Sequence, residues 1–330
     1  MAVTMADISK LRHLTGAGMM DCKKALTETN GDIEAAVEII RKKGQAVAAK
    51  REDREASEGC VLSKNVGDFA AIVALKCETD FVAKNAGFVA LTEKILDAAV
   101  AARAKSLDEV KALTIDGQTV ADLIVEEVGK TGEKMELGFY EYLEAPSTAS
   151  YNHLGNKLST IVGFNLADVD YQVGRDVAMQ VASMNPVAVD RASVPQSVIE
   201  GERTVAIEKT KQEQVKKAVE AALKKSGINP NLVDSEAHIE SNIAKGWLTE
   251  AEADKARAII KETAEAKAAN LPEQMIANIT TGRLNKFFKE SVLMEQEFIK
   301  DPQMTIEKYL KSANKDLVAV AFKRVNLNED

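Results

Sequence analysis

The chain has 330 residues, enough for two or three domains, and its 45% hydrophobic and 28% charged residues are typical of an ordinary soluble protein. The net charge of −8 argues against a general nucleic-acid binder, because phosphate backbones attract basic surfaces. The three cysteines form no CxxC pair, the three histidines lie far apart, and no apolar run reaches the roughly 20 residues that span a bilayer. We therefore expect a cytoplasmic protein without a signal peptide, a membrane segment, a disulfide framework or a metal site.

Residues 1–53 predict a small module of three helices. Asp7 is placed to cap the first helix, and the second runs from about Met19 to Thr29. In the third helix, apolar residues recur with the spacing of one buried face, and Gly44 is expected to end it. A stretch dense in charge then indicates a solvated linker or a helical extension.

Two features of this module bear on function. Met19 and Met20 are consecutive and cannot both face one core, so one of them is expected on an adaptable binding surface. The stretch Thr15-Gly16-Ala17-Gly18 is only weakly similar to a phosphate loop, because no strand precedes it and no Gly-Lys-Ser/Thr follows it. A turn between two helices explains it better.

Residues 54–143 predict a unit that mixes strands and helices. Two apolar strands flank a turn at Asn65–Asp68, and a further strand is expected from Glu133 to Glu144. Ser106 and Glu109 have the spacing of a capping box at the start of a helix. Because no regular βαβ repeat appears, the unit belongs to the α+β class.

The stretch Thr79-Asp80-Phe81-Val82 lies where a buried strand of this unit meets a helix. Thr79 or Asp80 suits a helix N-cap, since a short side-chain oxygen can accept from the first free backbone N–H groups. An exposed Phe beside a carboxylate would also suit a probe that enters another protein's pocket. Position alone favours the cap.

Residues 144–330 predict a second α+β unit, which a helical insertion interrupts at about residues 197–289. A strand from Leu158 to Leu166 and a helix from Asp170 to Met184 precede the insertion, and an alternating strand over 317–324 follows it and would complete the same sheet. The insertion is rich in Ala, Glu and Lys. Its pattern predicts long helices that pair as an antiparallel hairpin.

No catalytic constellation emerges from the sequence. Cys22 lies among Asp21, Lys23 and Lys24, and basic neighbours could lower its thiol pKa, but no His partner or oxyanion element accompanies it. His153, near the end of a strand, is better explained as a structural or interface histidine than as a general base. An enzyme built around Cys22 is therefore the weakest of the alternatives.

Three stretches together resemble the elongation factor Ts family, the bacterial guanine-nucleotide exchange factors of translation. They are Leu11–Leu26, Cys77–Lys84 with its unbroken Thr-Asp-Phe-Val, and the strand-turn-strand around Tyr151, His153 and Gly155. The similarity covers nearly the whole chain and is weakest from about Thr204 to Asn270. It implies an α+β fold with an N-terminal three-helix ubiquitin-associated-like module, a two-part α+β core and an inserted long helical hairpin.

The resemblance also implies a function without bond chemistry or a cofactor. A member binds the GDP complex of elongation factor Tu, disturbs its Mg²⁺ and promotes GDP release, so that GTP can rebind during translation elongation. The residues implied in Mg²⁺ displacement are Thr79, Asp80, Phe81 and Val82. The residues implied in partner binding are Met19, Met20, Lys23 and His153.

The implied partner is elongation factor Tu, both GDP-bound and nucleotide-free, with no direct nucleic acid and no membrane. The sequence does not decide whether the complex forms a dimer of heterodimers. The sequence departs from many members at Ala74 and Lys76, where Glu and Asn are common, and its region 204–270 exceeds their short coiled coil. Because the chain stops at Asp330, the C-terminal helical arm of some members is expected to be missing. The alternative is a non-catalytic protein-docking module without exchange activity.

Overall fold

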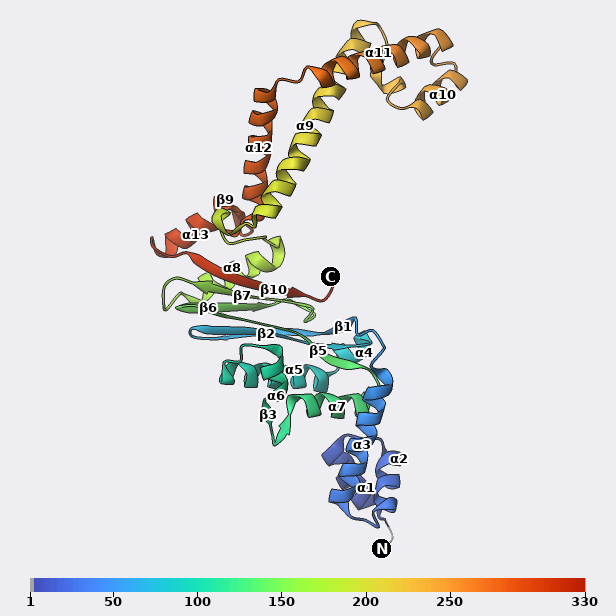
Figure 1. The fold of residues 1–330 in the computed structure, drawn as a ribbon. Coiled ribbons are helices and arrows are strands. Elements are labelled where there is room, and N and C mark those ends of the chain that lie inside the picture. Colours follow the sequence, from blue (N-terminus) through green and yellow to red (C-terminus); the bar gives the residue numbers. More distant parts are fainter. Residues whose placement is uncertain (1–2, 330) are drawn as a thin grey trace. The chain divides into compact units, whose positions relative to one another are not determined.

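The computed structural model describes residues 3–329, and contacts divide this part of the chain into two compact units. One unit contains the residues up to Val189 together with those from Glu297 onward, and the other contains residues 190–296. Figure 1 shows sheets and helices in the first unit, and the strands of these sheets pair antiparallel, which confirms the predicted α+β class. The domain boundaries drawn from the sequence stay predictions. No helix in the described part is both long and apolar enough to cross a bilayer.

The first three helices, α1 (Met5–Thr15), α2 (Met19–Glu28) and α3 (Ile33–Arg51), form a small bundle that we call the N-terminal module. Its core consists of small and medium apolar side chains, among them Ile8, Leu11, Cys22, Leu26 and Ala36. The prediction that Asp7 is the N-cap of α1 was wrong by three residues. Thr4 is the cap: its hydroxyl accepts from the Asp7 backbone N–H at 3.2 Å, and the Asp7 carboxylate accepts from the Thr4 N–H at 3.0 Å.

The prediction that Gly44 ends the third helix was also wrong, because α3 continues to Arg51. Gly44 is buried inside the helix, where α3 packs on α7 (Val120–Thr131). A Cβ atom at Gly44 would lie 3.3 Å from the Val125 carbonyl oxygen, and one at Gly129 would lie 3.0 Å from the Gly44 Cα. Glycine is therefore needed here for a close helix crossing rather than for a helix end.

The centre of the first unit is a pair of three-stranded antiparallel sheets that pack face to face. One has the strand order β1-β2-β5, the other β10-β7-β6. The strands are β1 (Glu58–Val66), β2 (Phe69–Cys77), β5 (Met135–Glu144), β6 (Ser147–Asn152), β7 (Leu158–Phe164) and β10 (Ala319–Asn326). The pairing of β10 with β7 confirms that the strand after the insertion completes the second sheet. The side chains between the sheets include Val61, Ile72, Ala74, Leu143 and Ile161.

Helices cover the outer face of each sheet, as Figure 1 shows. On the first sheet, Phe88 and Ile95 are fully buried against β1 and β2. This layer contains α4 (Asp80–Ala83), α5 (Ala86–Ala102), α6 (Leu107–Ala112), α7 and a small hairpin of β3 (Thr114–Ile115) and β4 (Gln118–Thr119). The capping box predicted at α6 is incomplete: Ser106 accepts from the Glu109 N–H, but the Glu109 carboxylate accepts from Lys105 instead.

The second sheet is covered by α8 (Tyr171–Met184), and the chain after the insertion returns to this helix. The returning segment contains β8 (Glu297–Phe298), β9 (Asp301–Thr305) and α13 (Ile306–Ala313). Asp176 of α8 is buried, and its carboxylate accepts from Lys300 Nζ at 2.6 Å, Tyr309 Oη at 2.9 Å and Gln172 Nε2 at 2.6 Å. One buried charge thus holds the returning segment on α8.

The second unit is helical, as predicted for the insertion. Its elements are η1 (Arg191–Ser193), α9 (Gln196–Lys225), η2 (Pro230–Leu232), α10 (Glu236–Ala244), α11 (Glu250–Ala269), α12 (Glu273–Ser291) and η3 (Leu293–Glu295). Both α11 and α12 pack along α9, which confirms the predicted helical pairing (Figure 1). A separate apolar cluster closes the end where α9, α10 and α11 meet, with Leu223, Val233, Ile239 and Leu248 buried.

Candidate functional site

The stretch Thr79–Val82, which we call the corner, follows β2 after the single residue Glu78 and begins α4. Thr79 is the N-cap, and its hydroxyl accepts from the Val82 N–H at 3.5 Å, so the predicted cap is confirmed. The helix it caps is only one turn long, however, because Asn85 caps a second helix, α5, by accepting from the Gly87 N–H at 2.8 Å. Two caps six residues apart make this a compact bend rather than the start of one helix.

The backbone of the corner is held by Glu133, which lies between α7 and β5. The Thr79 backbone N–H and hydroxyl both donate to the Glu133 carboxylate, at 3.0 and 2.6 Å. Hydrogen bonds to a charged acceptor are among the stronger ones in proteins. The sequence reasoning missed Glu133, since a partner 54 residues away follows no local period.

The side chains of the corner point into different environments. Phe81 has 84% of its surface exposed, whereas Val82 is half-buried against the core below. The Asp80 carboxylate accepts from Lys84 Nζ at 2.6 Å, and this hydrogen bond lowers the pKa of Asp80. At neutral pH the corner therefore presents an anion beside an exposed aromatic ring on a fixed backbone.

The turn between β6 and β7, residues 153–157, lies at the same end of the core. Lys157 in this turn pairs with Glu58 at 2.7 Å, and Glu58 stands opposite Cys77, two residues before the corner. His153 is exposed, and its Nδ1 lies 3.0 Å from the Tyr151 hydroxyl. The structure thus brings His153 to the end of the core that carries the corner, although 70 residues of sequence separate them.

The sequence reasoning also missed the roles of Leu154 in this turn and of Asn152, the last residue of β6. Leu154 is 95% exposed at its tip, a large apolar side chain in water. Asn152 anchors the turn on β1: its Oδ1 accepts from the Ser63 N–H at 2.6 Å and from the Ser159 hydroxyl at 2.8 Å. The turn is therefore a braced projection and not a loose loop.

The remaining predicted site residues lie on α2 of the N-terminal module. Met19 and Met20, at its start, are 49% and 75% exposed, so both face solvent where only one was expected to. Lys23, one turn further along, is exposed as well. The result is an adaptable apolar surface with a positive charge at its edge.

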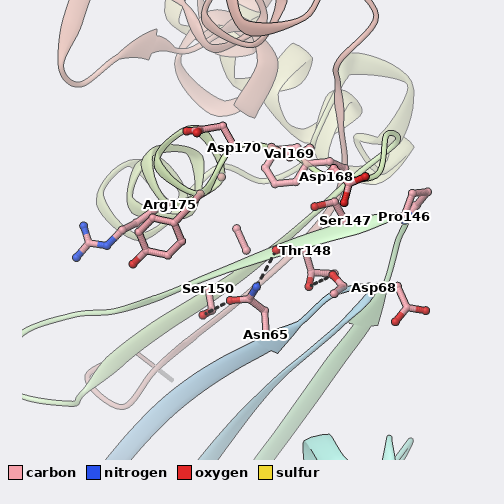
Figure 2. Close-up of a pocket in the computed structure, with 15 residues that line it drawn as sticks. Asn65, Asp68, Pro146, Ser147, Thr148, Ser150, Asp168, Val169, Asp170 and Arg175 are labelled. Atoms are coloured by element: carbon pink, nitrogen blue, oxygen red, sulfur yellow. Dashed lines mark hydrogen bonds between the residues drawn. The ribbon is translucent and has the colours of Figure 1, made fainter.

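A cavity of about 300 Å³ lies between the β1–β2 turn, β6 and the start of α8 (Figure 2). Its polar groups bond to one another: Asn65 donates to the Thr148 carbonyl at 2.9 Å, and the Ser150 hydroxyl donates to Asn65 at 2.8 Å. Arg175 lies over the Tyr151 ring at 5.4 Å. None of the predicted site residues lines this cavity, and residues 3–329 contain no cluster of three metal-ligating side chains.

All three cysteines are buried, and Cys22 packs in the core of the N-terminal module with its thiol directed at the Ala17 carbonyl. Burial raises the pKa of Cys60 to about 11 and that of Cys77 to about 12, from an ordinary value of 9.0. Such thiols are protonated and sealed from solvent at neutral pH. This favours a packing role for the cysteines over a nucleophilic one.

Because of these two thiols, the free energy of unfolding is expected to depend on pH in the alkaline range. Below about pH 8 both thiols are protonated whether the chain is folded or not, and they contribute no pH dependence. As the pH rises through 9 the unfolded chain loses these protons before the folded one does, so the free energy of unfolding is expected to fall. Urea titrations of the wild type and of a Cys60→Ala, Cys77→Ala double variant measure the effect, and the variant should show the shallower decline. Equal slopes would contradict it.

Comparison with known proteins covers the whole chain. A family model described as "Elongation factor TS" matches residues 78–234 and 218–329, which include the corner, the turn at His153 and the helical insertion. Proteins named elongation factor Ts from Phocaeicola vulgatus, Parabacteroides distasonis and Porphyromonas gingivalis are 62%, 59% and 47% identical to this chain. Each alignment spans 100% of both chains, so the N-terminal module and the long insertion are shared with these relatives.

Proposed function

Because this chain belongs to the elongation factor Ts family, we propose that it releases GDP from elongation factor Tu by disturbing the Mg²⁺ held beside the nucleotide. The observation that carries the proposal is the corner. Phe81 is almost fully exposed, Asp80 is ionised beside it, and Glu133 fixes the backbone beneath them. Burying an exposed aromatic ring in the partner is the kind of contact that dominates binding energy.

The physical basis is the charge of the ion. Mg²⁺ bridges protein and phosphate oxygens and is the largest local charge that holds GDP, so displacing it weakens the nucleotide complex. In this scheme Asp80 and Phe81 enter the partner next to the ion, while Thr79 and Val82 shape the bend that presents them. The factor binds the nucleotide-free state more tightly than the GDP state, and by linkage it lowers nucleotide affinity by the same factor. It makes or breaks no covalent bond.

We assign partner binding to two further surfaces. One is the start of α2, where Met19, Met20 and Lys23 are exposed. The other is the turn of His153, to which the structure adds Leu154 as an exposed apolar side chain. In this scheme the partner is bound in its GDP form and in its nucleotide-free form, without nucleic acid, in the cytoplasm where translation proceeds.

Exchange is tested with elongation factor Tu that carries a fluorescent GDP analogue. Adding this chain in substoichiometric amount, with excess unlabelled GDP, is expected to speed the loss of fluorescence with multiple turnovers. The docking-module alternative predicts a complex by gel filtration but no faster release. That result would overturn the exchange proposal while leaving the interaction in place.

A further inference from the structure

Glu78, the residue directly before the corner, connects the corner to the end of the N-terminal module. Its Oε2 accepts from Arg54 Nη1 at 2.9 Å, and its Oε1 lies 3.7 Å from Arg51 Nη1, the last residue of α3. Oε1 also accepts from the Lys134 backbone N–H at 2.6 Å. Only 17% of the Glu78 side chain is exposed, so these contacts are partly shielded from water and salt.

Lys134 makes a second connection to the same segment of chain. Its Nζ donates to the carbonyl oxygens of Glu52 at 2.9 Å and Arg54 at 2.8 Å, just beyond the end of α3. The neighbouring residue in sequence is Glu133, which holds Thr79. The two consecutive side chains therefore bind the corner on one side and the exit from the N-terminal module on the other.

The N-terminal module is also fixed further along α3, at the close crossing of Gly44 with Gly129 of α7. The segment that follows α7 carries Glu133 and Lys134. The crossing at Gly44 and the contacts at the end of α3 attach this helix to the core at two points. Two points restrict the rotation of the helix as well as its distance from the core, which a single contact does not. The same α7 segment thus supports both the N-terminal module and the corner.

We propose that Glu78 and Lys134 are positioning residues: they lock the N-terminal module and the corner into one rigid body, so that docking of α2 on the partner aims Phe81. The inference rests on the proposed exchange function. Two surfaces on one rigid support reach their targets together, because binding of the first sets a high effective concentration and a correct orientation for the second. Across a flexible joint, the first contact would form while the corner sampled unproductive orientations.

The kinetic test uses full-length Lys134→Met, which keeps the aliphatic stem and removes the ammonium group that holds the two carbonyls. The maximal rate of GDP release is expected to fall about tenfold, because the corner is no longer aimed. The half-saturating concentration should change less than about twofold, since α2 still docks. Glu78→Gln, which removes the charge that Arg54 faces, should act in the same direction.

The matched control is Asp97→Asn, which removes the exposed 2.7 Å ion pair with Lys64 at a place remote from the joint. It should leave both kinetic parameters unchanged. If the wild type promotes GDP release from the partner and Lys134→Met reaches the same maximal rate, the positioning role is wrong although the exchange function stands. If the wild type itself does not speed GDP release from the partner, the proposed exchange function is wrong, whatever the variants show.

A second readout is independent of exchange. Spin labels attached at Glu28→Cys in the N-terminal module and Asp108→Cys in the core measure the distance between these two parts. Labelling is selective, because both positions are exposed and the three native thiols are buried. The distance distribution is expected to be narrow in the parent and in Asp97→Asn, and clearly broader in Lys134→Met. A distribution that stays narrow in Lys134→Met, with an unchanged unfolding midpoint, would overturn the proposed lock.

Discussion

Replacing Phe81 with alanine is expected to lower kcat/KM for GDP release about thirtyfold, while the fold and its stability stay unchanged. The size follows from the loss of about 2 kcal/mol that accompanies truncation of an aromatic residue at the centre of an interface, with 1.4 kcal/mol for each tenfold change. The free energy of unfolding should not change, because Phe81 has 84% of its surface exposed and supports little of the core. Stopped-flow release of fluorescent GDP, with thermal unfolding of the free protein, measures both quantities.

The matched control for Phe81→Ala is Val66→Ala, which removes another exposed apolar side chain, 55% accessible, from the end of β1. It should leave release and stability as they are. Asp80→Asn separates charge from shape at the corner, and it should slow release with little effect on folding. A folded Phe81→Ala protein that releases GDP at the wild-type rate would rule out the corner as the probe.

The second large effect concerns stability and is expected for Asp176→Ala, which should lower the free energy of unfolding by about 3 kcal/mol. Asp176 is 4% exposed and accepts hydrogen bonds from Lys300, Tyr309 and Gln172, so its removal takes away the acceptor of three donors, of which the half-buried Tyr309 hydroxyl has the least access to water. The estimate stands at the lower end for a broken buried pair, because the Lys300 side chain is nearly half exposed and regains water. Urea denaturation at pH 7 measures the change.

The position of this network explains why it matters. Lys300 and Tyr309 lie just after the helical insertion, and Asp176 binds both to α8 beneath the second sheet. Asp316→Ala is a suitable control, since that carboxylate is exposed, and it should cost less than about 0.5 kcal/mol. Tyr309→Phe removes one hydrogen bond and should cost about 1 kcal/mol. A loss below about 1 kcal/mol for Asp176→Ala would show that this charge does not hold the segment.

The local pattern of the sequence predicted most helices and strands, since apolar periodicity depends only on which face of an element is buried. Strand β2 and helix α8 follow such patterns directly. Errors occurred where one residue type can serve two local roles. Asp7 suits an N-cap or the third position of a helix, and Gly44 suits a helix end or a close crossing. Only the surrounding structure decides between such roles.

The corner shows the same division between sequence and tertiary structure. The strand-to-helix change and the string Thr-Asp-Phe-Val were enough to locate it, because both are properties of consecutive residues, and the string is one of the three stretches on which the family resemblance rests. The contacts that hold it, from Glu133 to Thr79 and from Glu78 and Lys134 to the end of α3, were not predictable. A hydrogen bond between residues 24 or more positions apart depends on which segments the tertiary fold brings together, and no local spacing records that. The tertiary structure alone therefore determines that the corner is braced, that the turn of His153 shares its end of the core, and that the N-terminal module is attached beside it.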